Sequence, residues 1–195
     1  MKRILGSVLA AASLLGATCA AHAVSFTGQL AGATEAPPNA SPGTGTFLVD
    51  FDIAAHTMRV TTTFGGLLAP VSAAHIHCCT PSPGSGTAGV ATPVPTFPGF
   101  PSGVTGGSYD ATFDTSLASS YNPAFVTAQG GSVSAAELAL FAGLNAGTAY
   151  LNIHSTQFPA GEIRGFAARV PEPASLMLLA AGAVGLGLGR RRRPA

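Results

Sequence analysis

The 195-residue sequence contains no tryptophan, and only 9% of its residues are charged. Lys2 is its single lysine, so residues 24–169 contain none. This central stretch carries three arginines against seven acidic residues, a net charge of −4. Nucleic-acid binding through phosphate neutralisation needs clustered positive charge, and so does attachment to an anionic membrane surface. The composition therefore excludes both functions for the central stretch.

Common catalytic signatures are missing too. The sequence contains no Gly-x-Ser-x-Gly elbow, no phosphate-binding loop and no His-Glu-x-x-His motif. Asp50 and Asp52 alternate along one predicted strand, where we expect ordinary solvated charges rather than a pair of glycosidase carboxylates. The sequence therefore predicts a protein without enzymatic activity.

Residues 1–23 have the three parts of a secretory signal peptide. Lys2 and Arg3 form a basic region, and an apolar run follows from Ile4 to Leu15. Ala21-His22-Ala23 then places small residues at the two positions that signal peptidase reads. We predict cleavage by signal peptidase after Ala23 and export of the remaining chain across the inner membrane.

Residues 170–195 form a second targeting element. It consists of Pro171, Glu172 and Pro173, an uncharged apolar run from Ala174 to Gly189, and the cluster of Arg190, Arg191, Arg192 and Arg193. An apolar run of this kind suits a bilayer, and the arginines after it would stay cytoplasmic. The order of the three parts resembles the PEP-CTERM sorting tail of exported proteins in Gram-negative bacteria.

The resemblance to a sorting tail implies processing. An exosortase would recognise the Pro-Glu-Pro motif and cut near it, so that the C-terminal helix anchors the protein in the inner membrane only transiently. The processed protein would be released or stay attached at the cell envelope. The alternative with the same topology is a permanent C-terminal anchor.

The central stretch, residues 24–169, has the size of one domain. Apolar residues alternate in "GTFLVDFDI" and "HTMRVTTTF", which predicts a hairpin of two half-buried strands joined at Ala54-Ala55. Capping-box spacing from Ser134 to Glu137 predicts one short helix. These patterns indicate an all-β fold, an antiparallel β-sandwich with one short helix. The further strands are predicted at Ser25–Leu30, Ser72–Cys78, Ser108–Phe113, Thr148–His154 and Glu162–Ala168.

A segment rich in proline and glycine, Thr80 to Gly107, separates two of these predicted strands. A structureless loop of this length is uncommon in a compact domain, so it is either a binding loop or an exposed flap. We expect a flap that Phe97 and Phe100 hold against the sandwich.

Three segments of the domain carry a family resemblance: "FTGQLAGATEAPP", "AAHIH" and "GTAYLNIHSTQFPAGEIRGF". Together they resemble the CHRD domain, a module found in many bacterial exported proteins, over Phe26 to Phe166. The resemblance implies a β-rich extracellular module. Its most specific part is the last segment, with Asn152, His154, Pro159, Gly161, Glu162, Arg164 and Gly165.

In this last segment Pro159 and Gly161 predict a turn between two strands. Glu162 and Arg164 alternate on the second strand, so both side chains point the same way. They would form either a weak exposed pair or a partly buried hydrogen-bonded network with Asn152 and His154 that fixes the strand register.

His75 and His77 stand one residue apart on a predicted strand. Alternate residues of a strand share a face, so both imidazoles would lie together, with Cys79 if the strand continues. Imidazole and thiolate ligands suit Cu or Zn. His154 would join this site if the last hairpin packs nearby. The alternative is structural, because histidines near strand ends often donate hydrogen bonds to carbonyls or carboxylates.

Cys78 and Cys79 are the cysteines that remain once Cys19 leaves with the signal peptide. An oxidising compartment favours a disulfide, which here would join two adjacent residues. Free thiols, metal ligation and a bond between two molecules are the alternatives.

These patterns predict an exported, non-enzymatic module of the cell envelope or biofilm matrix that binds exopolysaccharide or a matrix protein. One alternative is a metal-binding protein or metalloenzyme that uses Cu or Zn on the His-x-His strand. Another is a structural matrix component that self-associates.

Overall fold

The computed structural model describes residues 23–171. Nearly all of the predicted signal peptide and sorting tail lies outside the described residues, including Glu172, Pro173, the apolar run and the four arginines. Among residues 23–171, none of the helices is long and apolar enough to cross a membrane. The strands are β1 (Val24–Ala31), β2 (Thr44–Asp52), β3 (Thr57–Gly65), β4 (Val71–His77), β5 (Gly107–Asp114), β6 (Tyr150–Ser155), β7 (Ile163–Phe166) and β8 (Ala168–Arg169).

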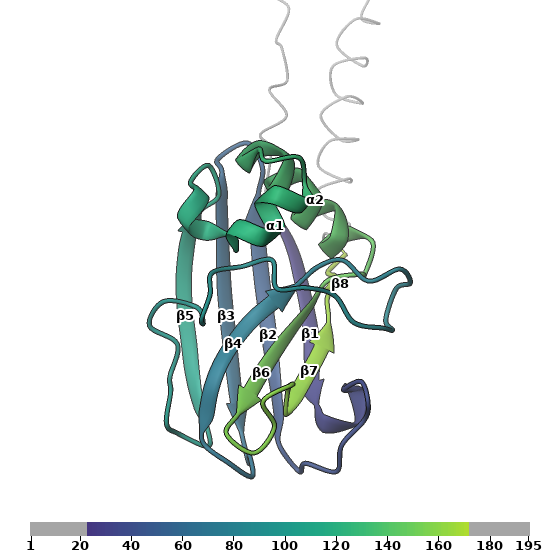
Figure 1. Ribbon diagram of the computed structural model, residues 1–195, viewed down its shortest axis with the longest axis vertical. Coiled ribbons are helices and arrows are strands. Elements are labelled where there is room, and N and C mark those ends of the chain that lie inside the picture. Colours follow the sequence, from purple (N-terminus) through teal and green to yellow (C-terminus); the bar gives the residue numbers. More distant parts are fainter. Residues whose placement is uncertain (1–22, 172–195) are drawn as a thin grey trace, which may run out of the picture.

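All eight strands belong to one antiparallel sheet. Its order is β4-β6-β7-β1-β2-β3-β5, and β8 pairs with β1. The sheet curls, so that β4 and β6 cross in front of β2 and β3 (Figure 1). The predicted antiparallel β fold is confirmed, and the two layers of the expected sandwich are parts of a single continuous sheet.

The core fills the space inside this curled sheet. The predicted hairpin forms β2 and β3, and its alternating apolar side chains point inward, as expected. From the other side, β4, β6 and β7 contribute aliphatic side chains, and each large one that is fully buried stabilises the fold by about 1.5–3 kcal/mol. The fully buried members include Phe26, Phe51, Met58, Ile76, Leu151, Ile153 and Ile163.

Two α-helices, α1 (Pro123–Ala128) and α2 (Val133–Asn145), cover one end of the sheet (Figure 1). The predicted cap of α2 is wrong: Ser132 caps the helix by accepting from the Ala135 N–H at 3.4 Å, and Ser134 lies inside it. The sequence analysis missed α1, although Asn122 followed by Pro123 is a helix-start signal.

The Thr80–Gly107 segment runs along the outer edge of β4. The N–H of Ile76 donates to Thr92 Oγ1, and the N–H of Ala74 donates to Thr96 Oγ1, both at 2.9 Å. Phe97 is fully buried and stacks with Tyr109, so the expected anchoring of this segment is confirmed. Because it satisfies backbone groups that an edge strand exposes, the segment is an integral part of the domain rather than a flap.

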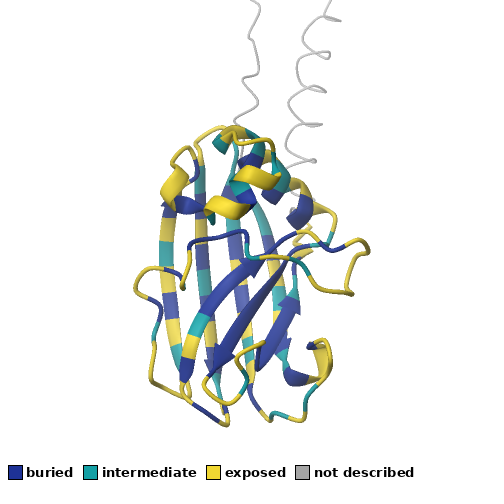
Figure 2. Ribbon diagram, in the orientation of Figure 1, coloured by how far each residue is buried: buried dark blue, intermediate teal, exposed yellow. Residues whose placement is uncertain are grey.

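Burial differs between the two parts of the sheet (Figure 2). From Phe47 onward, buried positions alternate with exposed or intermediate positions along β2, whereas β6 is buried at all six positions. One face of β6 is therefore covered by the core and the other by loops. Polar side chains on that second face need partners, because a buried polar group without one is costly. This covered face carries the candidate site.

Candidate metal centre

Three histidines meet on the covered face. His75 and His77 come from β4, and His154 comes from β6, which pairs with β4 in antiparallel register. The centroids of the three imidazole rings are 5.3 to 5.8 Å apart. One ring nitrogen from each histidine lies within 4.8 Å of the other two. The structure thus brings together the three histidines that the sequence analysis proposed as ligands.

A backbone carbonyl holds each of the three rings. His75 Nε2 donates to Pro95 O at 2.6 Å, His77 Nδ1 donates to Ala88 O at 2.9 Å, and His154 Nδ1 donates to the carbonyl at position 159 at 3.0 Å. Two of the acceptors belong to the Thr80–Gly107 segment. Such bonds orient the rings and leave the opposite nitrogen of each ring unprotonated.

The opposite nitrogens are His75 Nδ1, His77 Nε2 and His154 Nε2. All three are buried and have no hydrogen-bond partner within residues 23–171. Unsatisfied buried acceptors are rare and cost about 1–3 kcal/mol each. Zn–N bonds of about 2.0–2.1 Å place two nitrogens on a tetrahedral ion about 3.4 Å apart. The nitrogens that lie within 4.8 Å of one another, one from each ring, are therefore close to the spacing that a single ion requires.

Burial sets the protonation state of these rings. It lowers the pKa of His77 to about 4, although the Ala88 carbonyl acts in the opposite direction. Burial likewise lowers the pKa of His75 and of His154, against the effect of the carbonyl that each ring contacts. Neutral imidazole is the form that binds metals, and the site holds all three rings in that form near neutral pH.

Cys79 does not belong to this group, contrary to the expectation from strand alternation. β4 ends at His77, and a disulfide joins Cys78 to Cys79. The two sulfur atoms lie 3.9 and 3.7 Å from the Ala139 carbonyl oxygen of α2. The chain leaves the strand direction after His77, so the sulfur atoms face the helix instead of the imidazoles.

Glu162 and Arg164 lie on the same face of the final strand pair, as predicted, but they do not pair with each other. Glu162 Oε1 accepts from Ser41 Oγ and from the Leu68 N–H, both at 2.6 Å. The Arg164 guanidinium lies 3.7 Å from Glu35 Oε2. Both members of the predicted pair are buried, so each takes part in an internal network rather than in a weak surface contact.

The other residues of the final motif shape the backbone near the site. Asn152 stands between His75 on β4 and Arg164 on β7 in the strand register. A Cβ at Gly165 would collide with the Gln29 carbonyl of β1. The contact of Glu35 with Arg164 does not follow from the sequence pattern, because Glu35 lies in an irregular loop where residue spacing does not indicate which side chains face each other.

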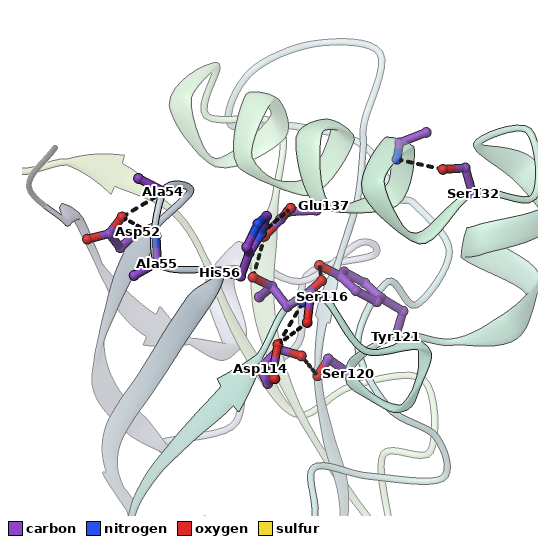
Figure 3. Close-up of polar contacts among 12 residues, drawn as sticks. Asp52, Ala54, Ala55, His56, Asp114, Ser116, Ser120, Tyr121, Ser132 and Glu137 are labelled. Carbon is purple, nitrogen blue, oxygen red and sulfur yellow. Dashed lines mark hydrogen bonds and ion pairs between the residues drawn. The ribbon is translucent and has the colours of Figure 1, made fainter.

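A second polar cluster lies at the helical end of the domain (Figure 3). His56, at the tip of the β2–β3 hairpin, donates through Nδ1 to both carboxylate oxygens of Glu137 on α2, at 3.0 Å each. Thr115 Oγ1 also donates to Glu137, and the Tyr121 hydroxyl donates to the Thr115 carbonyl at 3.0 Å. His56 is exposed while Glu137 is buried. These hydrogen bonds connect the tip of the β2–β3 hairpin to α2.

The fold and these sites define an antiparallel β domain with three converging histidines. Residues 26–167 match the family model of the CHRD domain, and the chain therefore belongs to the CHRD family. Residues 169–193 match the PEP-CTERM protein-sorting motif, an exosortase recognition signal. The chain is thus an exported surface protein that exosortase processes. Searches of curated proteins and of solved structures find no match.

Proposed function

We propose that this exported protein binds one transition-metal ion, Zn or Cu, through His75, His77 and His154. The observation that carries the proposal is the meeting of three buried histidines, with one ring nitrogen of each within 4.8 Å of the others and one nitrogen of each ring without a hydrogen-bond partner among the described residues. A purely structural histidine needs no such arrangement. Its second nitrogen would point to solvent or to a polar neighbour.

The donor set supports Zn or Cu over the hard cations. Three neutral imidazoles suit these two metals, whereas Ca and Mg prefer oxygen ligands. Three protein ligands leave at least one coordination position for water or another ligand. The carbonyls at positions 88, 95 and 159 supply the outer contacts that metal-bound imidazoles normally have.

Direct metal analysis of the exported protein tests this function. We expect about one Zn or Cu ion per chain after purification or after titration with either metal. His75→Ala, His77→Ala and His154→Ala should each lower the affinity by at least about 100-fold, because loss of a ligand exceeds the 10–100-fold effect of losing an outer contact.

His56→Ala is the matched control, because His56 lies in the separate cluster with Glu137. It should keep native metal affinity. Failure of the native protein to bind either metal would refute the proposal, and so would unchanged binding by the three ligand variants. Binding of exopolysaccharide or of a matrix protein without catalysis stays a prediction.

A further inference from the structure

A pocket of about 300 Å³ opens between the turn at residues 35–39 and the turn at residues 157–161. This volume lies at the lower end of the range for small-molecule sites. Proline rings hold the walls in fixed positions, so a ligand would not have to order them. The apolar walls are formed by Ala36, Pro37, Pro38, Phe158, Pro159 and Ala160.

Two buried residues with unpaired acceptor atoms lie at or beside this pocket: Glu35 lines it, and Asn152 lies against the lining residue Gly161. Glu35 is 7% exposed and Asn152 is 2% exposed. Glu35 Oε1 and Asn152 Oδ1 have no hydrogen-bond partner in the part of the chain that the structure describes. A Cβ at Gly161 would lie 2.7 Å from the first oxygen and 2.6 Å from the second. Gly161 therefore packs directly against both side chains, and any side chain at this position would clash with them.

The charge of Glu35 is already balanced. Arg164 lies 3.7 Å from Glu35 Oε2, and it also donates to the Gly86 carbonyl at 3.0 Å. Burial raises the pKa of Glu35 to about 7, although Arg164 and the Ala36 N–H lower it. A cationic ligand would add uncompensated charge to a buried pair. The unpaired Oε1 of Glu35 therefore suits a hydrogen-bond donor on a neutral molecule.

We propose that this pocket binds a neutral hydroxylated ring, one pyranose unit of a free sugar or of a glycan chain end. A hydroxyl of the ring would donate to Glu35, and its apolar C–H face would pack on Phe158 and the proline rings. The site uses none of the three metal ligands. It adjoins the metal centre through Pro159, whose carbonyl accepts from His154.

Saturation-transfer NMR with the exported protein tests this site. The probes are the methyl α-D-pyranosides of glucose, mannose and galactose, with maltotriose as a chain end and n-butylammonium as a cationic comparison. We expect saturation transfer to at least one of the pyranosides or to maltotriose, and none to n-butylammonium. Maltotriose binding without pyranoside binding would identify a glycan chain end as the source.

Two variants locate the binding. Glu35→Gln keeps the shape of the side chain but replaces a charged acceptor with a neutral amide, so affinity should fall about tenfold. Ala160→Trp should abolish binding by filling the pocket from its exposed rim. Ala128→Trp, on an exposed position at the end of α1, is the control and should bind the sugar normally.

Repeating the NMR experiment in the presence of EDTA distinguishes sugar binding in this pocket from sugar binding at the metal site. Sugar binding should persist in EDTA, because Glu35 and the apolar walls need no ion. Absence of sugar binding, binding of n-butylammonium alone, or native binding by Ala160→Trp would each overturn the inference. Loss of sugar binding in EDTA would also overturn it, because the sugar would then bind at the metal. If Glu35→Gln fails to fold, the result for Ala160→Trp alone decides whether the sugar binds in this pocket.

Discussion

The imidazole of His77 lies parallel to the phenol ring of Tyr150, with centroids 4.8 Å apart and an interplanar angle of 4°. The Tyr150 hydroxyl also accepts from the Ala88 N–H at 3.3 Å, and the Ala88 carbonyl accepts from His77 at 2.9 Å. Tyr150 thus positions His77 both directly, by stacking, and indirectly, by holding the residue that orients the imidazole.

Replacement of Tyr150 should therefore weaken metal binding although the residue is not a ligand. Tyr150→Leu removes the stacked ring, and we expect a 10–100-fold loss of Zn or Cu affinity, the usual effect of losing an outer contact. Tyr150→Phe keeps the ring and should lose less than about tenfold. Competition titration with a chelating dye measures both, and native affinity in Tyr150→Leu would contradict this role.

The disulfide between Cys78 and Cys79 should make an otherwise favourable helix substitution harmful. A Cβ at Gly143 would lie too close to Cys78 Sγ and 2.5 Å from Cys79 Sγ. Gly143→Ala should lower the free energy of unfolding by about 1–3 kcal/mol through overpacking.

In a protein that also carries Cys78→Ala and Cys79→Ala, the effect of Gly143→Ala on the free energy of unfolding should reverse its sign. Without the sulfur atoms, alanine should stabilise α2 by up to about 1 kcal/mol through its higher helix propensity. Urea unfolding of the four proteins measures both effects, and the same sign in the two backgrounds would refute the close contact.

Thr92 should matter more for stability than its size suggests. It is fully buried, and its hydroxyl accepts from the Ile76 N–H of β4 at 2.9 Å. Thr92→Val leaves that N–H without an acceptor and should cost about 1–3 kcal/mol. Thr63→Val is the control, because Thr63 Oγ1 contacts Thr46 Oγ1 on an exposed face at 3.2 Å. Its effect on urea unfolding should stay within about 0.5 kcal/mol, and equal losses would show that Thr92 does not support the edge of β4.

The contact between His56 and Glu137 should make stability depend on pH. Hydrogen bonding and attraction from Glu137 raise the pKa of His56 above 6.5, and Asp114 acts in the same direction. The folded state therefore holds this proton more tightly than the unfolded chain does. The stabilisation is complete below pH 6.5 and is lost as the pH rises through the raised pKa.

Urea unfolding from pH 5.5 to 8.5 compares the native protein with His56→Gln. The native protein should be more stable at the acidic end, and its advantage should shrink as the pH rises. His75, His77 and His154 titrate in both proteins, so their contribution cancels in the difference. A difference that does not vary with pH would contradict the contribution of the charged contact.

The sequence predicted the strands and the shared face of His75 and His77 because both follow from alternation along a strand, whereas the approach of His154 depended on how the last hairpin packs. Alternation placed His75 and His77 on one face, and the family motif placed His154 on a strand near the end of the domain. The same rule failed for Cys79, because alternation holds only while the strand continues, and β4 ends at His77.

Other parts of the site depend on loops, where spacing does not predict neighbours. Pro95 and Pro159 contribute carbonyl oxygens, which no side-chain motif reports. Glu35 reaches Arg164 across 129 positions of the chain, and only the curl of the sheet brings them together. Two layers from one continuous sheet likewise cannot be distinguished from two separate sheets by alternation alone.

The pairing of β4 with β6 has a thermodynamic consequence. β5, α1 and α2 lie between these strands in the chain, so the unfolded polypeptide holds no preassembled set of three imidazoles. An ion that binds only the folded state adds its binding energy to folding, about 2.7 kcal/mol at a free concentration of 100 times the dissociation constant. Metal bound by these three histidines would thus raise the free energy of unfolding of the exported protein.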